Sequence, residues 1–216
     1  MPEGHRNLEQ WLAEQGFGSK KLREAALAVL RETGVIGGRP RVHISEDKLD
    51  RAAGELAARY AVHCPDRDCA RLAKEMAAAG GRVVISAANR GACVVCRGSN
   101  SRRAFERARR ACVAAGLVRW LVVGGSPSFR QDLQRYLEPA PELSVDLDEG
   151  RSHDSRLLRS RAQRAQAIVI LATSQIDHKD TAVYTGDFRA KVITVASRGL
   201  EGLFEAMERR AGGGGK

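Results

Sequence analysis

Four of the five cysteines in this 216-residue chain stand in two closely spaced pairs, Cys64-x4-Cys69 and Cys93-x2-Cys96. Each spacing lets two thiolates of one tight turn face a common centre, and two such turns make the tetrahedral sulfur cage that zinc prefers. Two disulfides or four unrelated thiols are the alternatives. In a chain without a signal peptide, such pairs are more often metal ligands than disulfides. We therefore predict one Zn²⁺ ion held by these four cysteines.

Three nearby residues bear on the predicted metal site. His63 could replace its neighbour Cys64 as a ligand, although Cys64 is the simpler choice. Gly98 follows the second pair and supplies a permissive backbone that lets amides face sulfur. Cys112 falls on the same predicted helical face as several alanines, so we expect a buried thiol rather than a fifth ligand or a nucleophile.

The second chemical signal is an excess of arginine. The net charge is +10, and seven arginines between Arg97 and Arg119 accompany the single acid Glu106. A second arginine cluster runs over residues 151–164. Guanidinium groups match phosphate oxygens in pairs, so we expect a nucleic-acid partner, and both DNA and RNA fit. A solvated helix face, a nucleotide or a protein partner are the alternatives. The expected nucleic-acid contacts lie on one predicted helix and are Arg102, Arg103, Arg107, Arg109 and Arg110.

Composition and hydropathy narrow the class of protein. Apolar residues make up 43% of the chain, which is ordinary for a globular protein, and no apolar run is long enough to span a membrane. The N-terminal residues carry no apolar signal-peptide core, so we expect a cytoplasmic protein with reduced thiols and no membrane partner. Self-association into a homo-oligomer stays open.

Residues 1–62 are expected to form a small helical part. Leu8, Trp11 and Leu12 have helical spacing, Ser19 is a cap for a second helix, and Ser45 precedes a third. Three short helices with a basic connection are similar to a helix-turn-helix or winged variant, which would place one helix in a DNA groove. A plain packing or dimerisation unit is the alternative.

The cysteine pairs and an α/β region follow this helical part. In the metal-binding module, residues 63–101, we expect a turn at 64–69, a helix at 70–79 and a strand at 82–86. Residues 102–211 begin with the basic helix and then alternate strands and helices, which predicts a doubly wound parallel sheet. The tail, residues 212–216, is expected to be disordered. The strands are expected at 118–123, 143–147, 167–172 and 191–195.

Polar residues collect at the carboxyl ends of these predicted strands, where chemistry gathers in such sheets. Backbone amides of the Gly-Gly-Ser turn are suited to bind an anion. The alternative is that the glycines only allow a tight turn. Asp146 and Asp148 could hold a divalent ion or a ribose, or pair with nearby arginines. We assign His178 and Asp148 as candidate catalytic residues, with an exposed or capping histidine as the alternative. The candidate anion-binding residues are Gly124, Gly125, Ser126, Ser128, Ser174 and Arg198.

Residues 118–207 resemble a small, functionally uncharacterised family of bacterial Rossmann-like domains. The resemblance rests on the Gly-Gly-Ser segment at 121–128, the segment around Asp148, the strand at 167–170 with 174–178, and the closing segment 192–199. It implies a flavodoxin-like or receiver-like α/β sandwich and no established reaction. The metal module resembles a zinc ribbon.

Two classes of function fit these observations. In the first, the chain is a zinc-containing nucleic-acid-binding or regulatory protein whose Rossmann-like domain is a sensor or docking platform. In the second, it is a phosphodiesterase, nuclease or nucleotide-processing enzyme that uses the strand-end crevice for a nucleotide or phosphate ligand. The charge and the arginine-rich helix favour binding, and no catalytic signature favours the enzyme.

Overall fold

The chain folds into two compact units. The computed structural model describes residues 4–38, 42–150, 154–172, 176, 178–197 and 199–213, and only the backbone of His178. The units are Met1–Arg103 and Ala104–Lys216. The helical part and the cysteine pairs, which we separated at residue 62, therefore lie in one unit. Of the candidate residues, Ser174 and Arg198 lie outside the described part of the chain.

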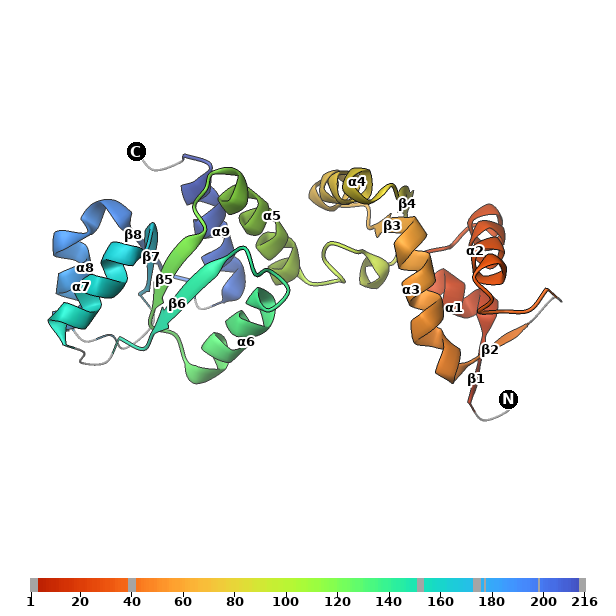
Figure 1. The fold of residues 1–216 in the computed structure, drawn as a ribbon, viewed down its shortest axis with the longest axis horizontal. Coiled ribbons are helices and arrows are strands. Elements are labelled where there is room, and N and C mark those ends of the chain that lie inside the picture. Colours follow the sequence, from red (N-terminus) through yellow and green to blue (C-terminus); the bar gives the residue numbers. More distant parts are fainter. Residues whose placement is uncertain are drawn as a thin grey trace. The chain divides into compact units, whose positions relative to one another are not determined.

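The N-terminal unit is mainly helical (Figure 1). Asn7, Ser19 and Asp66 each cap a helix by accepting a hydrogen bond from a backbone amide three residues ahead, which satisfies an otherwise unpaired donor. Leu8, Trp11 and other apolar side chains of the first helices form its core. Its elements are β1 (His5–Asn7), α1 (Leu8–Glu14), α2 (Lys20–Glu32), β2 (His43–Ser45), α3 (Leu49–Arg59), β3 (Tyr60–His63), α4 (Arg67–Gly80), β4 (Val83–Ser86) and the 3-10 turns η1 (Glu46–Lys48) and η2 (Arg90–Ala92).

A short β-α-β arrangement carries the cysteine pairs. Strands β3 and β4 pair in parallel, with His63 opposite Ser86, and α4 connects them. Residues 60–62 belong to the part that we expected to be helical, but α3 ends at Arg59, and the backbone of Tyr60–His63 pairs with β4 instead. Helix α4 also begins earlier than expected, because Asp66 caps it. Cys69 therefore lies in the first turn of a helix and not in a loop.

The C-terminal unit contains the predicted parallel sheet, and the α/β class is confirmed. Its four strands are all parallel, in the order β6-β5-β7-β8. Numbered by appearance, this order is 2-1-3-4, as in flavodoxin-like sheets, where the strand order reverses between the first and third strands. Its elements are α5 (Asn100–Ala114), β5 (Arg119–Val123), α6 (Pro127–Leu137), β6 (Ser144–Asp148), α7 (Ser155–Arg164), β7 (Ala167–Leu171), α8 (His178–Asp187), η3 (Arg189–Lys191), β8 (Val192–Val195) and α9 (Leu200–Ala211).

Helices cover both faces of this sheet, which makes a three-layer sandwich (Figure 1). Trp120 and Val122 of β5 pack on one face with α5, α6 and α9. Leu121 and Val123 point to the opposite face and pack with α7 and α8. Because side chains alternate along a strand, one short apolar run supplies both cores.

Strand β6 forms one edge of the sheet and has a polar face. Val145 and Leu147 pack with the core that contains α5, α6 and α9. Ser144, Asp146 and Asp148 alternate with them and therefore point to the opposite face. This face is the place where two of the predicted site residues lie. Within the described residues, no helix is both long and apolar enough to cross a membrane.

The burial of side chains in the two cores of the C-terminal unit predicts which substitutions lower its stability. Leu121 is fully buried, whereas Leu157 on α7 is 45% exposed. We expect Leu121→Ala to lower the free energy of unfolding of the C-terminal unit by about 2 to 5 kcal/mol, because it removes packed methyl groups and leaves a cavity. Leu157→Ala should change it by less than about 0.5 kcal/mol. Denaturant unfolding in a Trp11→Phe background, followed by the fluorescence of Trp120, measures both. Equal effects of the two variants would contradict the assignment of Leu121 to the core.

Candidate functional site

The four paired cysteines converge on one point in the N-terminal unit. All four are fully buried, and their sulfur atoms lie within 4.8 Å of one another. The Sγ atoms of Cys64 and Cys96 are 3.8 Å apart, too far for a disulfide, and all four thiols are free. Four sulfurs around one ion, each about 2.3 Å from it, lie about 3.8 Å from one another at the corners of a tetrahedron. The cluster therefore fits a metal ion.

The β-α-β arrangement brings these cysteines together. Cys64 directly follows β3, and Cys69 lies on α4. The loop of the second pair is fixed to β3, because the amide of Val94 donates to the carbonyl of Val62 at 2.8 Å. His63 does not belong to the cluster, and its Nδ1 lies 2.8 Å from the carbonyl oxygen of Cys64. Of these two candidate metal ligands, Cys64 therefore belongs to the site and His63 does not.

The electrostatics of the cluster favour a bound cation. Burial raises the pKa of Cys64, and burial together with the nearby Cys93 raises that of Cys69. Burial also acts against ionisation of Cys93, but backbone amides of Cys96, Cys64 and Val95 that donate to its sulfur lower its pKa overall. Cys93 therefore ionises more readily than Cys64 or Cys69. A cation would relieve the repulsion among the other thiolates.

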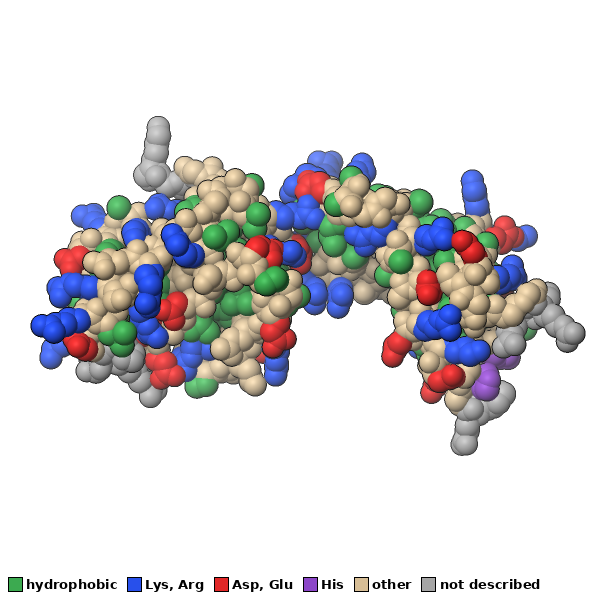
Figure 2. All heavy atoms as spheres, in the orientation of Figure 1, with side chains coloured by type: hydrophobic (Ala, Val, Ile, Leu, Met, Phe, Trp, Pro, Cys, Tyr) green, Lys and Arg blue, Asp and Glu red, His purple; other side chains and the backbone are tan. Residues whose placement is uncertain are grey.

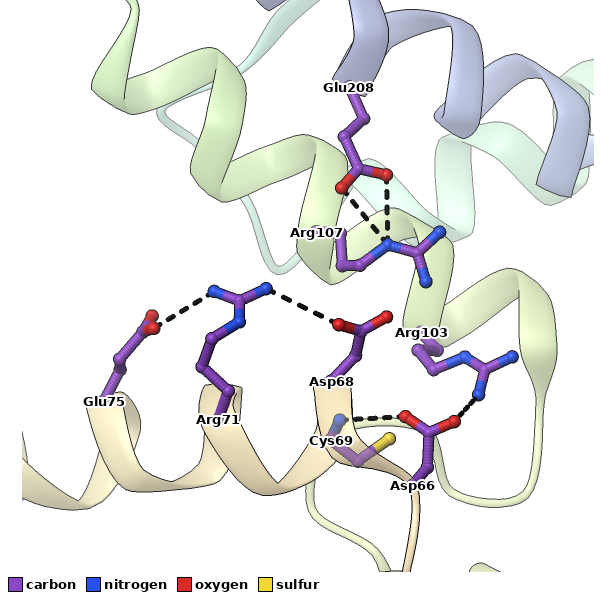
Figure 3. Close-up of polar contacts among 8 residues, drawn as sticks. All are labelled: Asp66, Asp68, Cys69, Arg71, Glu75, Arg103, Arg107 and Glu208. Atoms are coloured by element: carbon purple, nitrogen blue, oxygen red, sulfur yellow. Dashed lines mark hydrogen bonds and ion pairs between the residues drawn. The ribbon is translucent and has the colours of Figure 1, made fainter. Parts of the chain in front are cut away.

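A carboxylate outside the cluster holds one of the ligands in place (Figure 3). The Asp66 carboxylate accepts a hydrogen bond from the amide of Cys69 at 3.1 Å and forms an ion pair with Arg103. Burial acts to raise the pKa of Asp66, but the Cys69 amide and the Arg103 guanidinium lower it overall. The Nε atom of Arg103 is buried and has no hydrogen-bond partner in the described structure. Asp66 and Arg103 thus act on the cluster through Cys69. Sequence spacing alone did not indicate this role, although an aspartate three residues before a helical ligand is a capping signal.

The arginines of α5 are largely engaged by acids. Arg103 pairs with Asp66, and the Nε of Arg107 lies 3.0 Å from the Glu208 carboxylate (Figure 3). Arg109 pairs with Glu142 and lies 3.5 Å from Glu106. Arg110 also has an interaction partner. Only Glu106 is a sequence neighbour of these arginines, so the excess of positive charge along the sequence is much reduced in the fold.

The Gly-Gly-Ser turn follows β5 at the carboxyl edge of the sheet. Gly125 has a φ of +85°, and an added Cβ would lie 2.7 Å from the ring of Phe129. The hydroxyl of Ser126 accepts from the amide of Phe129 at 3.1 Å and lies 2.9 Å from that of Ser128. The Gly125 carbonyl accepts a hydrogen bond from Arg130 at 2.6 Å. The first turn of α6 is thus already capped by the chain itself.

Asp148 lies beside this turn and is bonded on both carboxylate oxygens. The Gly124 amide donates to the Asp148 carbonyl at 2.7 Å. One carboxylate oxygen accepts from the amide of Gly150 at 2.8 Å, and the other from Arg161 and Tyr184 at 3.0 and 2.9 Å. Burial and the Asp148 charge raise the pKa of Tyr184. Asp148 is 1% exposed, so this network ties β6 to α7 and α8.

The structure places the other candidate residues of this edge only in part. His178 is the first residue of α8, and its side chain lies outside the described part of the chain. Asp146 lies 3.4 Å from Arg161, which corresponds to the pairing alternative and not to a metal site. Sequence reasoning missed Asp180, which is 2% exposed and whose Oδ2 has no partner among the described residues.

A cleft of about 390 Å³ lies beside α7 on the polar face of β6. Arg119 comes from the start of β5, and Arg161 and Arg164 come from the last turn of α7. Arg161 is engaged by Asp146 and Asp148, whereas the side chains of Arg119 and Arg164 are exposed and make no hydrogen bond or ion pair with a described residue. Sequence reasoning assigned Arg119 and Arg164 to two different clusters. The sequence could not show that these two arginines are neighbours, because this depends on the order of the strands in the sheet.

Comparison of the chain with protein-family models, curated proteins and solved structures finds no match. The resemblances stated above for residues 118–207 and for the metal module therefore remain predictions.

The link between Asp66 and Cys69 can be tested by a pair of variants. Asp66→Ala removes the cap of α4, and we expect it to lower the free energy of unfolding by about 0.5 to 2 kcal/mol. It should also weaken metal affinity by about 10- to 100-fold, because Cys69 loses its support. Asp66→Asn keeps a capping oxygen and should preserve more of both. Competition with a chromogenic chelator measures the affinity. Equal losses in the two variants would assign the effect to the Arg103 ion pair instead of the cap.

Proposed function

We propose that this chain is a zinc-containing nucleic-acid-binding protein, in which the Rossmann-like unit contributes a phosphate-binding surface. The donor set supports zinc as the metal, because four thiolates in tetrahedral arrangement are typical of structural zinc sites. All four ligands are protein side chains, so such a site stabilises the fold and leaves no open position for substrate. In this proposal, Cys64, Cys69, Cys93 and Cys96 hold the ion.

The observation that carries nucleic-acid binding is the arginine-lined cleft beside α7. Arg119 and Arg164 have no ion-pair partner there among the described residues, whereas Arg161 is engaged by Asp146 and Asp148. Free guanidinium groups in a concave surface suit the closely spaced phosphates of a polyanion. Figure 2 shows Lys and Arg side chains gathered on this part of the C-terminal unit, over α7 and the neighbouring strands.

The C-terminal end of α7 would normally oppose an anion, because its unpaired carbonyls carry partial negative charge. Here the ammonium group of Lys191 donates to the carbonyls of Ala162, Gln163 and Ala165 at 3.1, 3.2 and 2.7 Å. This contact neutralises the end of the helix next to the cleft. The positive charge of Arg164 is therefore available to a ligand.

The helix α5 has a smaller part in the proposal than its arginine content suggests. Arg103, Arg107 and Arg109 would have to give up ion pairs before binding phosphate. Arg102 is half-buried and has no ion pair with a described residue, so it stays a candidate contact, and Arg110 would have to exchange an existing partner. For the enzymatic alternative, Asp148 is the best-described residue, and its carboxylate is fully engaged. Binding is therefore better supported than hydrolysis.

The zinc site predicts a metal content of one ion per chain. Cys96→Ser should lose the ion and strongly destabilise the N-terminal unit, because structural zinc supplies on the order of 10 kcal/mol of binding free energy to small modules. Cys112→Ala is the control, because Cys112 is buried in the other unit, where burial raises its pKa to about 12, away from the cluster. Elemental analysis of freshly purified, reduced protein measures the content. A zinc-free parent protein, or full zinc in Cys96→Ser, would overturn the assignment.

The cleft predicts a localised contribution to nucleic-acid affinity. Arg119→Gln with Arg164→Gln should weaken binding of a fluorescent single-stranded oligonucleotide. The slope of log affinity against log salt should fall by about 0.7 for each phosphate that the variant no longer neutralises. Arg156→Gln with Arg189→Gln removes the same charge from exposed positions outside the cleft and should leave more of the affinity. Fluorescence anisotropy over a salt series gives both quantities. Equal losses in the two double variants would show that the cleft contributes no more to affinity than any other pair of exposed positive charges.

A further inference from the structure

A second hollow lies in the N-terminal unit, directly beside the cysteine cluster. Its volume is about 350 Å³, within the range of small-ligand sites. Side chains of α3, β3 and the segment after α1 line it, and residues 91–94 close one side. Phe17 and Tyr60 meet there edge to face, with ring centroids 5.2 Å apart. The wall is thus mostly apolar and aromatic.

Two residues with polar side chains line this otherwise apolar wall. They are Gln15 and Arg97. Neither side chain forms a hydrogen bond or ion pair with any residue that the structure describes. Convergent polar groups without partners, set in an apolar pocket, are the usual sign of a site that orients a ligand.

The backbone of Arg97 adds an independent observation. Arg97 has a φ of +45° and is the one described non-glycine residue with a positive φ. It follows Cys96 in the cysteine turn, where its amide donates to the Cys93 carbonyl at 3.0 Å. Glycine would adopt this conformation without strain, whereas any other L-residue is disfavoured. Strained residues of this kind gather at binding sites, where the side chain gives a benefit that offsets the strain.

We propose that this hollow, the Arg97 pocket, binds a nucleotide unit, a nucleobase with its phosphate. The flat base would lie against Tyr60 and Leu56 in the apolar part of the pocket, since bases stack on aromatic side chains. The Gln15 amide offers one donor and one acceptor to the polar edge of the base. The phosphate would meet the guanidinium of Arg97. The source of the unit is either a free nucleotide or an unpaired nucleotide of a nucleic-acid chain.

This site is separate from the arginine-lined cleft and does not require it. The Arg97 pocket belongs to the N-terminal unit, whereas the cleft belongs to the C-terminal unit. The double variant Arg119→Gln with Arg164→Gln should therefore leave mononucleotide binding unchanged. Failure of either proposal can then be recognised without the other.

Two variants test the pocket in different ways. Arg97→Gly removes the guanidinium and relieves the backbone, so its melting temperature should be no lower than that of the parent protein. Ala57→Phe fills the pocket from an exposed position on α3 and keeps every charge. Arg31→Gln is the control, because it removes one exposed charge from α2 in the same unit. Circular dichroism and zinc content establish that each variant is folded.

The measurement is calorimetric titration of the zinc-loaded full chain with AMP, GMP, CMP and UMP, and with a short single-stranded oligonucleotide. We expect saturable binding of at least one of these probes. Arg97→Gly should weaken it by about tenfold or more, the loss expected for one charge-assisted hydrogen bond. Ala57→Phe should weaken it as well, because its ring occupies the space of the base, and Arg31→Gln should not. Binding of the oligonucleotide alone would identify a nucleic-acid chain as the source. No saturable binding of any probe, or parental affinity in both pocket variants, would overturn the proposal.

Discussion

The convergence of four cysteine sulfurs is the constraint on which the N-terminal unit depends. The four thiols are buried together, and burial and the charges of the other three raise the pKa of Cys69. Backbone amides can stabilise one thiolate, as they do at Cys93, but only a cation can balance several. The two-stranded pairing of β3 and β4 is too short to be stable alone. The ligands, the strand pair and the cap of α4 therefore support one another, and the Arg97 pocket is built on the same turn.

The fold, and not the order of residues along the chain, determines which arginines of this protein have ion-pair partners. The helix α5 appears as a row of free cations in the sequence, but its partners Asp66, Glu142 and Glu208 come from distant segments. The guanidinium groups left without partners among the described residues include Arg97, Arg119 and Arg164, and each of them lines a hollow in the surface. An arginine without an internal partner retains its hydration and its full charge, so it is the one that an anion can use at low cost.

The sequence predicted those features that depend on local pattern. The spacing of the cysteine pairs identified the cluster, and the apolar runs in the second half identified a parallel sheet. It missed β3, because four residues that continue a helical pattern carry no separate strand signal. It also could not show that both carboxylate oxygens of Asp148 accept hydrogen bonds. Arg161 and Tyr184 reach this carboxylate only after α7 and α8 pack on the sheet. The pocket beside the cysteines depends on the packing of three separate segments, which no local spacing encodes.

The polar face of β6 has a consequence for self-assembly. An edge strand exposes unpaired backbone groups and can add a strand from a second molecule, which leads to aggregation. In β6 every second residue is polar, and Asp146 stands in the middle of the strand. Antiparallel pairing of two copies around this position would bring two carboxylates together in the same face of the extended sheet. The repulsion of these carboxylates disfavours such pairing. The polar residues of β6 therefore protect this edge of the sheet from association with a second copy of the chain.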